Sequence, residues 1–120
     1  MTPERLDIST ESRDAAAGEI AFVRVAGEVD MANAHVLREQ LGSPASREAA
    51  GVVLDLTGVP FMDSDGLRAV LVAAAGLDAR LAVIAPADSA VGRLLELADV
   101  SDRVPSFETE KDAVAAVSGY

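Results

Sequence analysis

The chain has 120 residues, half of them hydrophobic, and a formal net charge of −10 at pH 7, which suits one folded domain and argues against a disordered chain. The absence of cysteine excludes disulfides, thiolate catalysis and cysteine zinc sites, and the negative charge makes nucleic acid a poor partner. The apolar runs are too short to cross a bilayer and no signal peptide is recognisable, so we expect a cytoplasmic protein without membrane insertion.

The N-terminal part predicts a β-hairpin. Apolar and polar residues alternate over 6–10, which indicates a half-exposed strand. Residues 13–18 are expected to form the turn. The run 20–25 is apolar on both faces apart from Arg24, so it predicts a second strand that would pair with the first.

A helix is expected after this hairpin. Asp30 is a candidate N-cap, and the helix would run through Leu41 with one apolar face. Residues 42–50 are expected to form a loop, although 45–50 could extend the helix. The run 52–56 is almost continuously apolar, which is typical of a buried strand in a parallel sheet.

The second half of the chain alternates helices with strands. Apolar residues at i, i+3, i+4 and i+7 begin at Leu67 and again at Val91, and they predict one helix ended by Gly76 and another capped by Asp88 or Ser89. The remaining elements are strands over 81–85 and 104–107 and a helix over 109–117. This order predicts an α/β domain, with four helices on a mixed sheet of four to five strands that has an antiparallel N-terminal hairpin and parallel crossovers.

The segment Asp63-Ser64-Asp65-Gly66 is the best candidate for a chemical site. It follows a buried strand and opens a helix, at the edge of an α/β sheet where ligands and modifications concentrate. The Ser64 side chain cannot point into the core without breaking the apolar stripe that begins at Leu67, so we expect it to be exposed. Asp and Ser are also favoured at helix starts for purely structural reasons, and that alternative stays open.

Two other phosphotransfer interpretations fit single residues but not their surroundings. Residues 61–66 look like the Asp-x-Asp-Gly motif of haloacid-dehalogenase-like phosphatases, but the stretch after Pro60 is too short for a central strand. Asp55 could be the phosphoacceptor of a response-regulator receiver. A receiver needs an acidic pair to hold Mg²⁺, and the nearest candidates, Glu28 and Asp30, are separated from Asp55 by only one helix, which leaves one strand too few.

Two linked motifs resemble those of a known family. VVLDLTGVPFMDSDGLRAVL resembles the signature of STAS domains, in which an apolar strand ends in Asp-Leu and Asp-Ser-x-Gly then opens a helix. The upstream GEVDMANAHVLREQL is similar to the family's other hallmark, Gly-Glu-x-Asp before the first helix. Because the resemblance covers about residues 6–117, we expect residues 1–120 to form a single STAS domain of the anti-sigma-factor-antagonist type.

The resemblance implies a non-enzymatic switch that uses no cofactor or metal. In such antagonists the serine of Asp-Ser-x-Gly is phosphorylated by the anti-sigma factor, which is a serine kinase of the GHKL type. The unmodified form binds that kinase and frees the sigma factor, and a PP2C-type serine/threonine phosphatase resets the switch. On this sequence Ser64 would be the phosphoacceptor. The partner-binding residues would be Asp30, Asp63, Asp65, Gly66 and Leu67.

One residue departs from the family pattern. Asp65 occupies the variable position of Asp-Ser-x-Gly, where a small residue is more usual, and its charge disfavours a second negative group beside it. It could select a kinase with a complementary Arg. It also leaves open a STAS module that is never phosphorylated and acts as a structural subunit of a lipid-transport or stress-signalling complex. Nearby, Phe61 is expected to anchor the core or the loop, and Met62 either forms an exposed apolar patch or lies buried.

Overall fold

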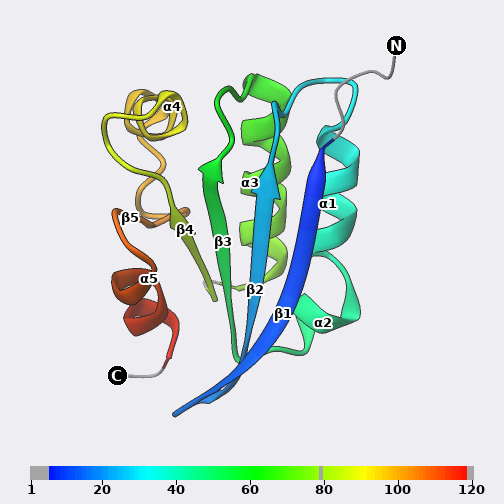
Figure 1. The fold of residues 1–120 in the computed structure, drawn as a ribbon, viewed down its shortest axis with the longest axis vertical. Helices are drawn as coiled ribbons and strands as arrows, with labels where there is room; N and C mark the ends of the chain where they lie inside the picture. Colours follow the sequence, from blue (N-terminus) through cyan, green and yellow to red (C-terminus); the bar gives the residue numbers. More distant parts are fainter. Residues whose placement is uncertain (1–5, 79, 119–120) are drawn as a thin grey trace.

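One mixed five-stranded sheet carries the fold (Figure 1). The computed structural model describes residues 6–78 and 80–118. The strands lie in the order β1-β2-β3-β4-β5; β1 pairs with β2 antiparallel, and the other neighbours are parallel. The elements are β1 Asp7–Ala15, β2 Gly18–Ala26, α1 Ala34–Leu41, α2 Pro44–Arg47, β3 Gly51–Gly58, α3 Ser64–Gly76, β4 Leu81–Ile84, α4 Ala90–Ala98, β5 Ser106–Phe107 and α5 Glu110–Val117. The α/β class and the mixed sheet are therefore as the sequence predicts.

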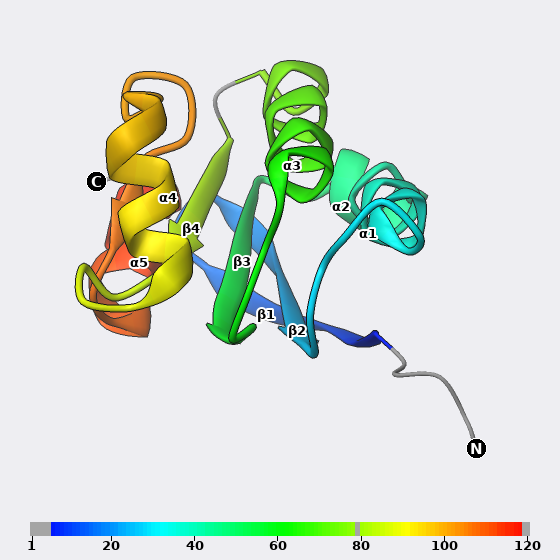
Figure 2. The same ribbon diagram turned by 90° about the horizontal axis from the view of Figure 1, so that it is seen from above.

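The two faces of the sheet are covered unequally. α1 and α3 lie side by side over one face (Figure 2), where Val23, Leu54 and Leu37 belong to the larger apolar cluster. The opposite face carries a smaller cluster that includes Phe22 and Ala113 of α5. This alternation follows from the period of two in a strand, which sends successive side chains to opposite faces. Among the helices of residues 6–78 and 80–118, none has the length and apolar composition needed to cross a membrane.

Three helices begin at the caps that their sequences supply. The side chain of Asp63 accepts hydrogen bonds at the start of α3, that of Ser89 does so for α4, and that of Thr109 does so for α5. Such side-chain oxygens satisfy backbone N–H groups that have no partner within the helix. Ser89, not Asp88, is thus the cap of the helix that the second apolar stripe predicts.

The hairpin turn is shorter than expected. β1 continues to Ala15 and β2 begins at Gly18, so the prediction of a turn over 13–18 is wrong at both ends. Arg13 lies directly opposite Ile20 in the ladder, and its guanidinium sits 3.9 Å from the centre of the Phe22 ring. This cation–π contact, together with the ladder hydrogen bonds, explains why a charged residue continues the strand.

The first helix also begins later than expected, so Asp30 is not its N-cap. The cap position belongs to Asn33, whose side chain accepts no hydrogen bond from the helix. Asp30 instead closes the preceding turn, where its Oδ1 accepts the Ala32 N–H at 2.9 Å and its carbonyl accepts the Ala34 N–H at 2.8 Å. A local Asx turn has therefore replaced the first helical turn.

Two further boundaries differ from the predictions. The expected loop over 42–50 contains the short helix α2, which starts at Pro44, where the missing N–H of proline costs nothing. Residues 6–78 and 80–118 thus form five helices where four were predicted, and one of the five is a single turn. The last strand spans only Ser106–Phe107, directly after Pro105, which has no N–H to contribute to a ladder.

Candidate functional site

The two loops that carry the sequence motifs are joined by backbone hydrogen bonds. The N–H of Val29 donates to the carbonyl of Phe61 at 3.0 Å, and the N–H of Asp63 donates to the carbonyl of Val29 at 3.1 Å. Nearer the sheet, Gly27 donates to the carbonyl of Gly58 at 3.0 Å. The Gly-Glu-x-Asp loop and the Asp-Ser-x-Gly loop therefore form one surface at the carboxyl ends of β2 and β3.

Asp63 holds this surface together. Its Oδ1 accepts the N–H groups of Asp65 at 2.9 Å and Gly66 at 3.0 Å, which caps α3, and its Oδ2 accepts the N–H of Met31 at 3.2 Å. One carboxylate thus fixes the start of α3 against the loop before α1. This bridging role, beyond the cap, is not visible in the sequence because it joins residues 32 positions apart.

Ser64 is the first residue of α3, and its side chain is exposed, as the sequence predicts. Its hydroxyl makes no hydrogen bond to any residue of the described part of the chain. It lies at the start of α3, where the helix dipole favours negative charge, although Asp63 already accepts the N–H groups of Asp65 and Gly66.

The other predicted site residues divide into exposed and buried positions. Asp65 is exposed, and Asp30 and Leu67 are partly buried. Gly66 is buried, and a Cβ at this position would stand 2.5 Å from Met62 Cγ and 2.9 Å from Val29 Cγ1. Gly66 therefore allows the close approach of α3 to the loop and offers a partner little surface.

The apolar side chains beside Ser64 are not the ones that the sequence suggests. Met62 is 4% exposed, so it lies buried and does not form the exposed apolar patch that was the other predicted alternative. Phe61, expected as an anchor, is 48% exposed, and Met31 is 78% exposed. The only sequence signal for Met31 is its position outside the apolar stripe of α1. Two large apolar side chains are thus exposed on the two joined loops that lead to Ser64, and exposed apolar side chains of this kind are typical of protein interfaces.

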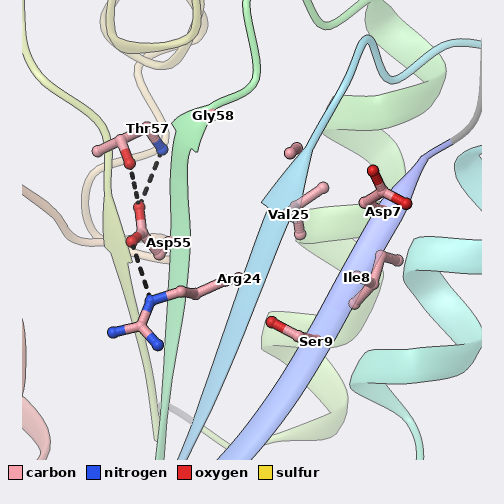
Figure 3. A pocket seen from close by; sticks show the side chains of 9 residues that line it. Asp7, Ile8, Ser9, Arg24, Val25, Asp55, Thr57 and Gly58 are labelled. Atoms are coloured by element: carbon pink, nitrogen blue, oxygen red, sulfur yellow. Dashed lines mark hydrogen bonds and ion pairs between the residues drawn. The ribbon is translucent and has the colours of Figure 1, made fainter.

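A hollow lies at the same edge of the sheet, on the face opposite α3. It has a volume of about 440 Å³, and the residues that line it include Arg24, Asp55 and Thr57. Figure 3 shows the Arg24 and Thr57 side chains both turned towards Asp55. The Asp55 carboxylate accepts from the N–H and the hydroxyl of Thr57, at 2.9 and 2.7 Å, and lies 3.7 Å from the Arg24 guanidinium. One carboxylate oxygen of Asp55 therefore accepts two hydrogen bonds within the chain, and the other forms an ion pair with Arg24.

Arg24 belongs to an ion-pair network over Phe22. It contacts Glu11 at 2.6 Å and Glu110 at 2.9 Å, and Arg13 contacts the same two carboxylates at 3.3 and 3.0 Å. Hydrogen bonds from Arg13 and then Arg24 lower the pKa of Glu11. The pKa values of both arginines are raised, chiefly by the hydrogen bond to Glu11. The network therefore ties β1 and β2 to the first residue of α5.

The geometry does not support the two rejected phosphotransfer sites. Asp63 caps a helix instead of ending a strand, which is unlike the haloacid-dehalogenase nucleophile. The antiparallel β1 and the strand order differ from the parallel 2-1-3-4-5 sheet of receiver domains. Within residues 6–78 and 80–118 there is no group of three Asp, Glu, His or Cys side chains placed to hold a metal ion.

Comparison with protein families identifies the domain. The model of the STAS domain matches residues 12–113. The chain belongs to the STAS family. It is 29% identical over 103 residues to the anti-sigma-F factor antagonist RsfB of Mycobacterium tuberculosis, a match that covers 83% of each protein. This family assignment agrees with both linked motifs in the sequence.

Solved STAS structures have the same fold. An anti-sigma factor antagonist from Mycobacterium paratuberculosis superimposes with a TM-score of 0.76 at 27% identity, over 92% of this chain and 94% of that one. SpoIIAA in its unphosphorylated form gives a TM-score of 0.68 at 18% identity, over 95% and 100%. The phosphorylated form of Bacillus SpoIIAA gives 0.64 at 19% identity, over 92% and 99%. The likeness to SpoIIAA concerns the fold alone.

Proposed function

We propose that this protein is an anti-sigma factor antagonist that is switched by phosphorylation of Ser64. The observation that carries the proposal is the free, exposed hydroxyl of Ser64 at the start of α3, within the Asp-Ser-x-Gly motif of a STAS domain. The protein would act as a cytoplasmic binding module, not as an enzyme. Its relatives include proteins named as anti-sigma factor antagonists, which supports this assignment.

The unphosphorylated form would bind the anti-sigma factor, a serine kinase of the GHKL type, and so release the sigma factor. Met31 and Phe61 would supply apolar contacts around Ser64, because large exposed side chains near the centre of an interface contribute most to affinity. Asp30 and Asp65 would make polar contacts. A PP2C-type phosphatase would remove the phosphoryl group and restore binding, so that transcription is regulated indirectly.

Asp63, Gly66 and Leu67 would serve the interface by shaping it. Both carboxylate oxygens of Asp63 accept hydrogen bonds from backbone N–H groups, and Gly66 is buried. Their contribution to docking would therefore be the fixed position of the α3 start and of Met31. Leu67, partly buried against the core, would present only its outer part.

Phosphorylation would block docking without changing the fold. A phosphoryl group adds a charge of about −1.5 to −2 at neutral pH, and a helix start tolerates it. In an interface packed around Ser64 the same charge must be desolvated and would lie beside Asp65 and Asp63. A loss of about 3 kcal/mol weakens binding on the order of a hundredfold, which is enough for a switch.

One observation favours a second function. Asp65 is exposed directly beside Ser64, and its negative charge opposes the addition of another. A STAS module that is never phosphorylated, and that serves as a structural subunit of a lipid-transport or stress-signalling complex, would show this feature without conflict. It would use the same apolar surface for a permanent contact.

A pulldown with three forms of the chain separates the two functions. Wild type, Ser64→Ala and Ser64→Asp would each be presented to a lysate of the host cell. Recovery of a GHKL-type kinase by wild type and Ser64→Ala, but not by Ser64→Asp, is the expected result. Recovery of membrane-transport subunits by all three forms would support the structural role and contradict the switch.

A further inference from the structure

A groove between α1 and α3 runs away from Ser64. Its near end is a hollow of about 200 Å³ whose lining includes Met31 and Asp65, both at the proposed docking surface. Its far end is a hollow of about 140 Å³ bounded by Gly42 and Gly76. Arg38 lines both hollows, so the two are parts of one groove that is continuous with the Ser64 surface.

The charge of this groove is opposite to that of the whole chain. Arg68 lines the near hollow, Arg47 lines the far one, and Arg38 lies between them. Within residues 6–78 and 80–118 these three arginines form no ion pair, whereas Arg13 and Arg24 are paired. Asp65 is the one acidic residue that lines either hollow. In a protein of net charge −10, such a stripe of unpaired arginine is a local site for negative charge.

The far hollow adds an apolar element. Val72 is 50% exposed, and Leu41, Ala73 and Leu77 form the buried wall beneath it. The space suits one apolar side chain. Arg38 and Arg47 flank the hollow, so carboxylates on either side of that side chain would meet guanidinium groups, the geometry that arginine recognises best.

We propose that this groove is the second half of the docking surface and takes an acidic amphipathic segment of the partner, with an apolar side chain between carboxylates. The proposal rests on the function proposed for Ser64, because it is the continuity with that surface that assigns the groove to the same partner. Arg38 and Arg47 would then set the specificity of the antagonist for its kinase. Charge complementarity of this kind mainly governs association rate and partner choice.

Peptide titration tests the groove without the partner. The probes are a helical peptide with leucines on one face flanked by glutamates, and the same peptide with lysines in place of the glutamates. We expect the acidic peptide to shift the amide NMR signals of Gly42, Val72 and Gly76 in the 120-residue chain, and to bind more weakly as salt rises. Absence of these shifts, or equal binding of the lysine peptide, would overturn the proposal.

Charge reversal supplies the matched control. Arg38→Glu with Arg47→Glu should weaken the acidic peptide about tenfold. Arg93→Glu with Arg103→Glu changes the net charge by the same amount at exposed arginines outside the groove, and should leave the affinity unchanged. Equal losses in both pairs would show only a long-range effect of charge and contradict the groove. Unfolding temperatures of both pairs show that each is folded.

The recovered kinase separates this inference from the proposed function. If Ser64→Asp abolishes kinase binding while Arg38→Glu with Arg47→Glu binds normally, the switch stands and the groove fails. If Ser64→Asp binds as wild type does, the proposed function itself fails. If the arginine pair instead dissociates a homodimer in sedimentation, the occupant is a second copy of the chain, and the proposal is wrong.

Discussion

Ser64 and Asp55 lie near the same edge of the sheet, yet they differ in how their polar groups are used. The Asp55 carboxylate receives two hydrogen bonds from Thr57 and faces Arg24, all within the chain. The Ser64 hydroxyl is exposed and has no such partner among the described residues. A buried or engaged polar group stabilises the fold, whereas a free one on a rigid frame is available to another molecule. Asp55 therefore contributes to the stability of the fold, whereas Ser64 is the residue that we propose as the switch.

The substitution with the largest expected effect on binding is Ser64→Asp. We expect binding of the anti-sigma factor kinase to weaken on the order of a hundredfold, because a charge enters the packed interface. The free energy of unfolding should change by less than about 0.5 kcal/mol, since the residue is exposed. Calorimetric titration and urea unfolding measure the two quantities. Ser64→Ala should bind as wild type does, and tight binding by Ser64→Asp would contradict the electrostatic account.

The packing of the start of α3 against the loop that contains Val29 can be tested at Gly66. Gly66→Ala places a Cβ against Met62 and Val29, and should lower the free energy of unfolding by about 1 to 3 kcal/mol through overpacking. Gly76→Ala is the matched control in the same helix, since nothing lies within 4 Å of its added Cβ. It should stabilise the protein by about 0.5 to 1 kcal/mol.

Urea unfolding of the two glycine variants decides the point. A Gly66→Ala protein as stable as Gly76→Ala would mean that the start of α3 does not pack against the loop as described. Kinase binding by Gly66→Ala should also weaken, because the two joined loops that carry Met31 and Phe61 must shift.

At Asp55 we expect a substitution to change stability and leave kinase binding unchanged. Asp55→Ala removes the acceptor for the Thr57 N–H and hydroxyl and one partner of Arg24, and should cost about 1 kcal/mol of stability. Kinase affinity should stay at the wild-type value. Thermal unfolding and titration together check this. Loss of binding at unchanged stability would place the partner on the hollow around Arg24 and reverse the assignment of the two sites.

The smallest expected effect is the pH dependence of the ion-pair network. Arg13 and Arg24 lower the pKa of Glu11 below its ordinary value of 4.5. A lowered pKa means that the ionised carboxylate stabilises the folded state above the unfolded-state pKa, and that this contribution is lost as the pH falls through the folded-state pKa. Wild type should therefore have a slightly higher unfolding temperature than Glu11→Gln at neutral pH, and the difference should shrink as the pH falls below the unfolded-state pKa of Glu11. A difference that does not vary with pH would exclude this linkage.

The sequence predicts those features that depend on neighbours along the chain. The apolar stripe from Leu67 locates α3 and the exposure of Ser64, and the alternation in β1 and β2 predicts the hairpin. Local propensity does not reveal that Asp30 closes an Asx turn before α1. Pro44 is compatible both with the loop that the sequence predicts and with the first position of the helix α2 that the structure contains.

Long-range contacts account for the features that sequence reasoning missed. Arg13 meets Glu110 across 97 positions, and Asp63 reaches Met31 across 32. Which of Phe61 and Met62 is buried depends on the bridge from Met62 to Val29, which no periodicity reports. The candidate serine is therefore visible in the sequence, but the apolar surface around it is not.

The most direct test is the mass of the intact protein after incubation with ATP and the recovered kinase. The account predicts that wild type gains one phosphoryl group, that fragmentation places it on Ser64, and that Ser64→Ala gains none. The phosphorylated protein should unfold at the wild-type temperature and no longer bind the kinase. An unmodified wild type, a phosphoryl group on another residue, or a phosphorylated form that still binds would contradict the account.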